Sequence, residues 1–469
     1  MEGLEIREKL LSNSYENKDF RIDSQFFTQE PYHNPKLKYD SIGNLIKRAQ
    51  YGISIAMNEE GIGYPIYRMN EIHNMLCDSD VSKSADISKE ELETFTLNDR
   101  DVVFNRTNSF EWVGRTGLYK KKNSKNYVFA SYLVRFIPDE DVLLPEYLTA
   151  FLNSKYGVQD IKRRARQSIN QTNVNPEEVK AIDIPLLSKP FQNHLKSAFD
   201  ISHNCIIKSE EKYRQAEKLL IQEIDLENFT PSTEGVNIKV LTNSFGNSGR
   251  LDAEYYQPKY DDYLSKVYTY ENGYDNIISA CSIKLKNFKP EDNKSYKYIE
   301  LSNIGKTGDI TGCTIDLGKE LPSRARRKVN LGDVIVSSIE GSLDSCALVT
   351  EEYNNALCST GFYVINSKNI NSETLLVLFK SELMQNLLKQ NCSGTILTSL
   401  NKDDFLNIPI PLIDNEVQKN IKNSIKESFA LKKQSEHLLE VAKRAVEIAI
   451  EEGEDKGLEY INVNTKNLN

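Results

Sequence analysis

Clusters of Lys and Arg in short stretches are the residues of this sequence that most clearly indicate a binding chemistry. Residues 100–135 contain eight Lys or Arg against two acidic residues, on a chain whose formal net charge is −9. Lys and Arg neutralise phosphates, and Arg, Asn and Gln pair with base edges in the major groove. Because an acidic surface repels a polyanion, a nucleic acid would have to be met by such local clusters. The alternative for each cluster is a solvated charged surface with no partner.

The candidate nucleic-acid-binding residues fall in three clusters. The first lies within residues 100–135, the second is the strip KRRAR at 162–166, and the third is SRARRK at 323–328. The single tryptophan, Trp112, is either an anchor at a loop tip or part of a core. The candidates are Arg106, Asn108, Arg115, Lys120, Lys121, Lys122, Lys162, Arg163, Arg164, Arg166, Arg324, Arg326, Arg327 and Lys328.

No catalytic or metal-binding motif accompanies these clusters. The sequence lacks GxxxxGK[ST], HExxH, GxSxG and a GxGxxG after a strand. Its seven cysteines are scattered without a CxxC, which favours reduced thiols over disulfides or a zinc site. Asp101 lies two residues after LND at 97–99, and Asp333 is the last residue of LGD at 331–333; for both, a turn that leads into a strand is favoured over catalysis. We therefore expect no catalytic residue and no metal site.

An internal repeat is the strongest structural signal in the chain. RIDSQFFTQEPY at 21–32 pairs with RLDAEYYQPKYD at 250–261, and LNDRDVVFNR at 97–106 pairs with VNLGDVIVSS at 329–338. IDIPLL at 182–187 pairs with NIPIPLI at 407–413. The blocks keep one order at offsets of 226 to 232 residues, which indicates two tandem halves and excludes a solenoid of short repeats.

Each half changes once from a strand pattern to a helix pattern. Short β-rich runs fill residues 39–137 and about 277–366, and a short helix then precedes each IDIPLL-like strand. Residues 191–227 and 417–450 carry apolar side chains at helical spacing, predicting helices of roughly 50 Å at 1.5 Å per residue.

The apolar stripe of each long helix needs a partner, and the equivalent helix of the other half supplies one. We therefore expect an antiparallel coiled coil, with packing of each helix on its own domain as the alternative. The predicted seam residues are Leu195, Phe199, Leu219, Leu220, Ile421, Ile425, Leu438 and Leu439.

The composition is that of an ordinary globular protein, and no apolar run or leader resembles a membrane span or signal peptide, so we expect a cytoplasmic protein without a membrane partner.

The arrangement resembles the DNA-specificity subunits of type I restriction–modification systems along nearly the whole chain. The matching segments of the first half are residues 51–72, 97–109, 143–154 and IDIPLL with Gln192, and those of the second are residues 296–304, 331–338 and 407–421. The second half departs from the family pattern at residues 281–295, where CSIKLKNFKPEDNKS replaces the glycine-led strand of the family.

The resemblance implies an α+β fold of two pseudo-symmetric halves, each a β-rich target-recognition domain followed by a long helix of the coiled coil. The implied plan is target-recognition domain 1 (1–188), first spacer helix (189–228), linker (229–250), target-recognition domain 2 (251–414), second spacer helix (415–452) and a mobile polar tail (453–469). The two domains would read the halves of a split DNA target about 34 Å apart, a gap that the roughly 50 Å rod can span.

The resemblance also implies partners that supply the chemistry. Two adenine methyltransferase subunits, which bind S-adenosylmethionine, would dock on the helices, and a motor-nuclease subunit would join them. This chain lacks the [ND]PP[YFW] motif, because Asn175 and Pro176 precede Glu177, so we expect no cofactor here. The expected role is non-catalytic binding of double-stranded DNA; the alternatives are an enzyme of unknown chemistry and a protein scaffold without DNA contact.

Overall fold

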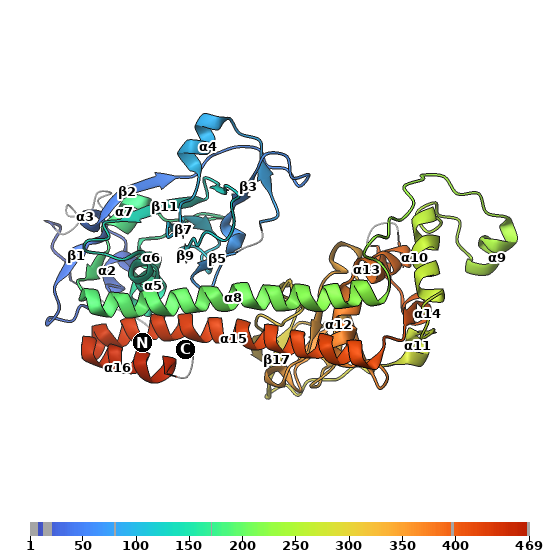
Figure 1. The fold of residues 1–469 in the computed structure, drawn as a ribbon. Coiled ribbons are helices and arrows are strands. Elements are labelled where there is room, and N and C mark those ends of the chain that lie inside the picture. Colours follow the sequence, from blue (N-terminus) through green and yellow to red (C-terminus); the bar gives the residue numbers. More distant parts are fainter. Residues whose placement is uncertain (1–7, 13–20, 79–80, 170, 395–397, 467–469) are drawn as a thin grey trace. The chain divides into compact units, whose positions relative to one another are not determined.

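The computed structural model of the chain describes residues 8–12, 21–78, 81–169, 171–394 and 398–466 (Figure 1). It divides into two compact units, of which unit 1 comprises residues 1–206 and 432–469 and unit 2 comprises residues 207–431. Within the described ranges, no helix is long and apolar enough to cross a membrane.

Unit 1 is built around a six-stranded sheet whose central strands are fully buried. Its order is β2 (Ile46–Tyr51), β11 (Leu133–Pro138), β7 (Val102–Asn105), β9 (Thr116–Leu118), β5 (Leu76–Cys77) and β4 (Ile72–His73). Three smaller sheets are β10 (Val128–Phe129) with β3 (Tyr64–Tyr67) and β6 (Ser84–Ala85); β12 (Arg166–Gln167) with β13 (Thr172–Asn173) and β8 (Thr107–Asn108); and β1 (Tyr39–Ser41) with β14 (Asp183–Pro185). The helices are α2 (Ser24–Thr28), α3 (Ile42–Leu45), α4 (Lys89–Phe95), α5 (Pro145–Asn153), α6 (Lys155–Arg164), α7 (Pro176–Lys180) and α16 (Glu454–Thr465).

Unit 2 contains two four-stranded sheets. The first is β16 (Cys281–Ile283), β23 (Phe362–Ser367), β20 (Val334–Ser337) and β21 (Cys346–Leu348); the second is β18 (Thr314–Leu317), β17 (Ser295–Ile299), β22 (Leu357–Ser359) and β19 (Ala325–Lys328). Two strand pairs complete it, β24 (Cys392–Ser393) with β25 (Ser399–Leu400) and β15 (Tyr274–Asn276) with β26 (Pro409–Pro411). Its helices are α9 (Phe245–Ser248), α10 (Pro258–Tyr268), α11 (Ile277–Ala280), α12 (Ser372–Lys380), α13 (Glu382–Gln390) and α14 (Lys402–Asn407).

The two units share one topology, which confirms the predicted duplication. The order β2-β11-β7-β9 in unit 1 corresponds to β16-β23-β20-β21 in unit 2. The parallel pair β3 and β10 corresponds to the parallel pair β17 and β22, and the antiparallel pair β1 and β14 corresponds to β15 and β26.

A buried glutamine makes the same set of hydrogen bonds in each unit. Gln192 Oε1 accepts from the backbone N–H of Leu144 at 2.7 Å, and its Nε2 donates to the carbonyls of Val142 and Leu187. Gln418 Oε1 accepts from Asn371 N at 2.7 Å, and its Nε2 donates to the carbonyls of Asn369 and Ile413. Each glutamine thus joins the start of a long helix to the loop before a short one.

The repeated aspartates also have equivalent structural roles. Asp101 accepts from the backbone N–H of Asn98 at 2.8 Å and pairs with Arg135, whereas Asp333 accepts from Asn330 N at 2.7 Å and pairs with Lys284. These bonds close a turn immediately before a buried strand, which agrees with the turn interpretation.

Helices α8 (Lys189–Glu223) and α15 (Asn415–Glu452) each pass through both units. In unit 1, Ser202 Oγ lies 2.7 Å from Ser435 Oγ, and in unit 2, Ser209 Oγ lies 3.1 Å from Ser428 Oγ. From the first serine pair to the second, the residue number rises by seven on α8 and falls by seven on α15. The two helices therefore pair antiparallel, as expected.

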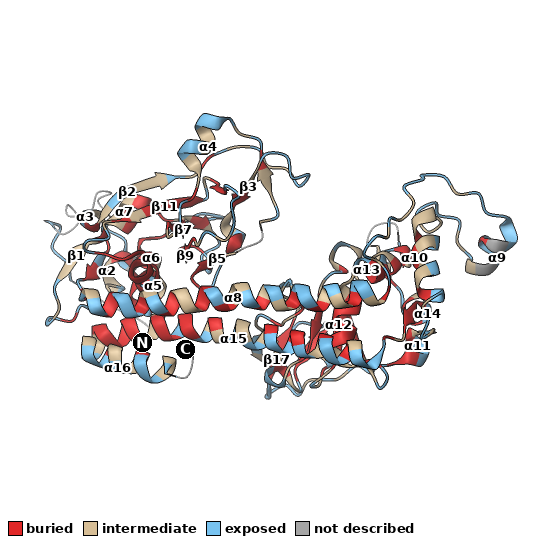
Figure 2. Cartoon of the chain, in the orientation of Figure 1, coloured by how far each residue is buried: buried red, intermediate tan, exposed pale blue. Residues whose placement is uncertain are grey.

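The predicted seam residues lie on the buried stripe of the two helices (Figure 2). In unit 1 this stripe belongs to one hydrophobic cluster together with residues of α5 and α6, so both helices pack on the sheet domain of the first half as well as on each other. Leu219 is only half-buried. The others, Leu195, Phe199, Leu220, Ile421, Ile425, Leu438 and Leu439, are at most 2% exposed.

The prediction of a mobile polar tail is wrong for residues 454–465, which form α16. Gly457 lets this helix approach closely, because a Cβ there would lie 2.7 Å from Phe191 Cε2 and 2.9 Å from the carbonyl of Ala445. Ile461, four residues later, is 2% exposed. Two small contact points in a polar stretch are too weak a pattern to predict a docked helix.

Candidate nucleic-acid interface

Several polar and aromatic side chains of unit 1 meet where β7 ends. Arg106 follows β7, and its guanidinium lies 5.2 Å from the ring centroid of Tyr51. Its backbone N–H donates to the carbonyl of Tyr132, and its carbonyl accepts from Val174 N. Tyr51 and Tyr132 remain 48% and 38% exposed. The backbone thus fixes a cation beside an exposed ring, an arrangement that suits contact with phosphates and bases.

The small sheet β12-β13-β8 extends this edge with amide and guanidinium groups. Arg166 pairs in register with Asn173, which in turn pairs with Thr107. The side chains of Arg166 and its neighbour Gln167 are exposed, and Asn108 is half-buried. These groups offer the donors and acceptors that direct readout of base edges requires.

The loop at residues 109–115 presents the exposed aromatic residues Phe110 and Trp112. Trp112 is 43% exposed and Phe110 is 39% exposed, so Trp112 is not part of a core. The guanidinium of Arg115 lies 3.5 Å from the centroid of the Trp112 ring, and burial lowers the pKa of Arg115. A stacked Arg–Trp pair on a surface loop can in turn stack on a base.

Lys162 anchors this loop through hydrogen bonds to its backbone carbonyls. Its ammonium donates to the carbonyls of Phe110, of Glu111 at 3.0 Å and of Val113 at 2.9 Å. Burial lowers the pKa of Lys162 to about 8. Because its three donors are directed at the loop, Lys162 positions Phe110 and Trp112.

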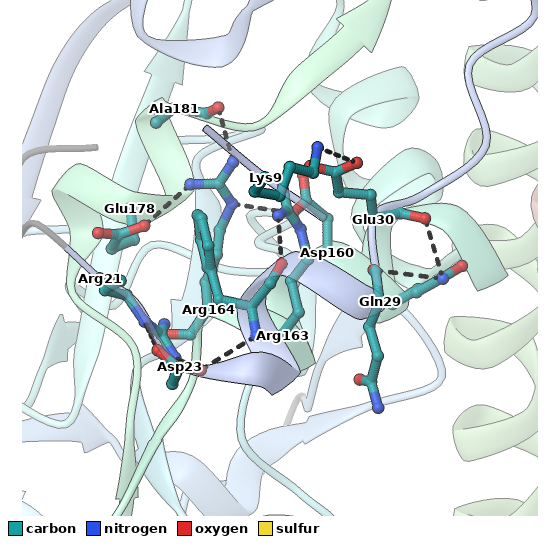
Figure 3. A network of polar contacts seen from close by, with 12 residues as sticks. Lys9, Arg21, Asp23, Gln29, Glu30, Asp160, Arg163, Arg164, Glu178 and Ala181 are labelled. Atoms are coloured by element: carbon teal, nitrogen blue, oxygen red, sulfur yellow. Dashed lines mark hydrogen bonds and ion pairs between the residues drawn. The ribbon is translucent and has the colours of Figure 1, made fainter. Parts of the chain in front are cut away.

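The proposed DNA contacts of Arg163 and Arg164 do not agree with their positions, because both side chains are buried (Figure 3). Both pair with Asp160, and Arg164 also pairs with Glu178 at 2.9 Å. Arg163 donates to the carbonyl of Phe26. Every third or fourth residue of α6 faces the interior, and buried charges must be paired, so these arginines join α6 to its surroundings.

Lys120 is also engaged within unit 1. Its ammonium lies 2.9 Å from Asp200 on α8 and 4.0 Å from Asp99. Burial and the charges of Lys122 and Lys120 lower the pKa of His203 on α8 to about 4, so this strip lies against the helix. Lys120 is thus half-buried and paired with Asp200, whereas Lys121 is exposed; the DNA contacts of both stay predictions.

The basic strip of unit 2 lies on and beside β19. Arg324 is exposed and pairs with Glu300 at 3.2 Å, and Arg326 donates to the carbonyl of Ser323. Arg327 is half-buried and donates to the carbonyl of Lys284. Lys328 is exposed, with its ammonium 5.9 Å from the ring of Phe288. Arg324 and Lys328 are the two members of this strip most open to an external phosphate.

Part of this surface carries no charge and is not marked by clusters of Lys and Arg in the sequence. Tyr51 and Tyr132 carry no charge and lie far from Arg106 in the sequence, so only the strand register brings them to Arg106. In the part of the chain that is described, no three His, Cys, Asp or Glu side chains are placed to hold a metal ion. The assembled groups are suited to binding a polyanion.

Residues 276–440 match the family model of the type I restriction modification DNA specificity domain. This part of the chain, within the second half of the sequence, is similar to a type I DNA specificity domain. The resemblance to type I specificity subunits is thereby confirmed.

The same kind of protein appears among relatives of the chain. The type I restriction enzyme EcoKI specificity subunit of Escherichia coli K12 is 30% identical over 155 residues, which are 32% of this chain and 32% of that protein. A Methanocaldococcus jannaschii protein named as the specificity subunit of the type I restriction enzyme MjaX is 23% identical over 211 residues, 43% of this chain and 49% of that protein. The chain aligns with less than half the length of either relative.

Two solved structures also resemble the chain. The S subunit of a type I system from M. genitalium is 12% identical with a TM-score of 0.36, covering 92% of this chain and 98% of that chain. The HsdS subunit from Thermoanaerobacter tengcongensis is 11% identical with a TM-score of 0.30, covering 91% and 100%. At these scores the likeness carries no argument about function.

Proposed function

We propose that this chain is the DNA-binding subunit of a type I restriction–modification complex and reads a duplex target in two separate parts. The observation that carries the proposal is the DNA specificity domain at 276–440, whose sheet order is repeated in unit 1. Unit 1 reads one part of the target with the groups around Arg106, and unit 2 reads the other.

The two halves are suited to unlike sequences. At the offset of 230 that relates β9 to β21, the loop NSFEWVGR at 108–115 aligns with SIEGSLDS at 338–345, and no residue is identical. Loops of different chemistry on one scaffold read different bases, so the proposed target has two unlike parts.

The catalytic steps belong to partner proteins in this proposal. Two methyltransferase subunits bind S-adenosylmethionine and modify adenine, and a motor-nuclease subunit completes the restriction complex. This chain binds no cofactor and performs no bond-breaking step; its role is to select the DNA, in the cytoplasm where the chromosome lies.

The proposal is tested by mapping N6-methyladenine in cells that carry the chain with the methyltransferase encoded beside it. We expect methylation at one split sequence, lost when the gene for this chain is deleted. In solution, the purified complex should bind that duplex more tightly than a scrambled one, with an affinity that falls as salt rises. Absence of both sequence-dependent methylation and salt-dependent DNA binding would overturn it.

A further inference from the structure

Arg115 is a half-buried arginine whose guanidinium has no hydrogen-bond or ion-pair partner among the described residues. It lies 3.5 Å from the centroid of the Trp112 ring, and burial lowers its pKa, an effect that the charge of Glu111 offsets only in part. Arg68, also half-buried in unit 1, instead pairs with Glu71 at 2.6 Å. A guanidinium that loses hydration and gains no acceptor is unfavourable, so a ligand that supplies acceptors would bind well here.

The backbone around Arg115 is already held in place within unit 1. The carbonyl of Arg115 accepts from Asn105 N at 2.8 Å, and the carbonyl of Asn105 accepts from Gly114 N at 2.8 Å. Gly114 has a φ of +92°, and a Cβ there would lie 2.6 Å from Cγ2 of Ile161 on α6, so glycine lets the loop lie this close to the helix. A side chain mounted on such a backbone loses little conformational entropy when it binds a ligand.

The equivalent loop of unit 2 has no arginine. Arg115 and Ser345 occupy the same position, because the carbonyl of each accepts from the last residue of the strand that precedes the loop. In unit 1 the donor is Asn105 N, at 2.8 Å, and in unit 2 it is Ser337 N, at 3.2 Å. Residues 338–345 contain no Lys, Arg or aromatic residue. A serine hydroxyl cannot replace the parallel N–H donors of a guanidinium, so a ligand that needs them is bound by one half only.

A guanine edge offers the acceptors that Arg115 lacks. In the major groove, O6 and N7 of guanine lie at the spacing of the guanidinium N–H groups, and this pair is the commonest specific contact to a base. Stacking on Trp112 covers one face of the guanidinium and leaves its N–H edge available. A phosphate is attracted mainly by charge, which an exposed lysine supplies without losing hydration. The restrained and partly dehydrated plane of Arg115 therefore favours a planar pair of acceptors.

We propose that Arg115 reads one guanine in the part of the DNA target that unit 1 binds, with Trp112 positioning the guanidinium. The inference rests on the proposed function and adds to it the identity of one base and the half that reads it. Unit 2 makes no such contact at the equivalent Ser345, so this G·C pair belongs to one part of the target only.

The test uses the full-length chain together with the methyltransferase encoded beside it. The variants are Arg115→Gln, which removes the charge, and Arg115→Lys, which keeps the charge but lacks the parallel donors. Arg48→Gln is the matched control, because Arg48 is an exposed arginine of β2 in the same unit. Mapping of N6-methyladenine gives the sequence that each protein recognises in cells. Competition between duplexes that differ at one base pair gives the discrimination in solution.

We expect the preference for G·C to fall by about 5- to 150-fold at one position of one target part in both Arg115 variants. All other positions should keep their preference, and Arg48→Gln should recognise the wild-type sequence. Thermal unfolding shows whether each variant is folded. Arg115→Lys keeps both the charge and an aliphatic stem, so it carries the test even if Arg115→Gln does not fold.

The other outcomes would overturn the inference or the proposed function. Binding that weakens equally for all sequences, with a salt slope reduced by about 0.9 in Arg115→Gln but not in Arg115→Lys, would assign Arg115 to a phosphate and overturn the inference. An unchanged recognised sequence in both Arg115 variants, or a change in both target parts, would also overturn it. A wild-type protein that neither directs methylation to a split sequence nor binds duplex DNA would instead overturn the proposed function.

Discussion

The ammonium of Lys120 lies 2.9 Å from the carboxylate of Asp200, so an ion pair fastens the sheet domain of unit 1 to α8. We expect Lys120→Ala to lower the free energy of unfolding by about 0.2–1 kcal/mol, and to leave the salt dependence of DNA binding unchanged. Thermal unfolding and titration of duplex DNA at several salt concentrations measure the two effects. Lys121→Ala is the control and should not affect stability. A DNA-binding slope reduced by about 0.9 in Lys120→Ala would place Lys120 in the interface.

Trp112 is the single tryptophan of the chain, so its fluorescence reports on one loop. If a base stacks on the Trp112–Arg115 pair, emission should be quenched when duplex DNA binds. Trp112→Ala should weaken binding by about 1–3 kcal/mol, the usual effect of removing one stacked aromatic side chain. Tyr268→Ala, at an aromatic residue of unit 2 that is 50% exposed, should not weaken binding. Unquenched emission in a saturated complex would place the loop outside the interface.

The charge of Lys162, and with it the anchoring of this loop, depends on pH. Burial lowers the pKa of Lys162 to about 8, whereas an exposed lysine titrates near 10.5. Between these values the unfolded chain binds more protons at this residue than the folded chain, so the contribution of Lys162 to stability rises with pH. The loop meanwhile loses its charged anchor, so DNA affinity should fall between pH 7 and pH 9. The decrease should be smaller in Lys162→Met, and an equal decrease in both proteins would contradict the role of Lys162.

Gln192 offers a test of the domain-to-helix connection. It is 2% exposed and bonds three backbone groups, so Gln192→Ala should destabilise the protein by about 2–3 kcal/mol through unpaired buried groups. Gln418→Ala should have the same effect in unit 2, whereas Gln159→Ala at the surface should change little. Chemical denaturation measures all three variants. Little change on removing Gln192 would show that its bonds are replaceable by water.

The helix pair is tested by placing a charge in its stripe. Leu439 is 2% exposed, so Leu439→Asp should prevent stable folding of unit 1, at a loss of several kcal/mol. Leu219 is half-buried, so Leu219→Asp should lower the melting temperature less. A melting temperature that is unaltered in Leu439→Asp would count against a packed seam.

The fold was predictable because its strongest signals are periodic and occur twice. The stripes of α8 and α15, the strands before Gln192 and Gln418, and the turns at Asp101 and Asp333 follow from spacing and local chemistry. The docking of α16 was not predictable, because Gly457 acts through the absence of a side chain and its contact with Phe191 is distant in sequence.

The site was harder to predict than the fold, because charge in a sequence does not show which way a side chain points. Arg164 and Arg166 are two residues apart, yet one is buried against Asp160 and Glu178 while the other is exposed. The helix α6 ends between them, and that boundary decides their environments. Tyr51 reaches Arg106 only through the pairing of β2, β11 and β7, which no local pattern reveals.

Helix α16 has a consequence for any shortened form of this protein. The carboxylate of Glu454 accepts hydrogen bonds from the backbone N–H of Ser188 at 2.9 Å and from its hydroxyl, immediately before α8 begins. A premature stop codon after Glu452 would spare every residue assigned to DNA recognition. It would, however, remove α16 and expose the ring of Phe191 to solvent. We expect such a product to aggregate, and under the proposed function a genetic screen would record it as a loss of restriction with no lesion in any recognition loop.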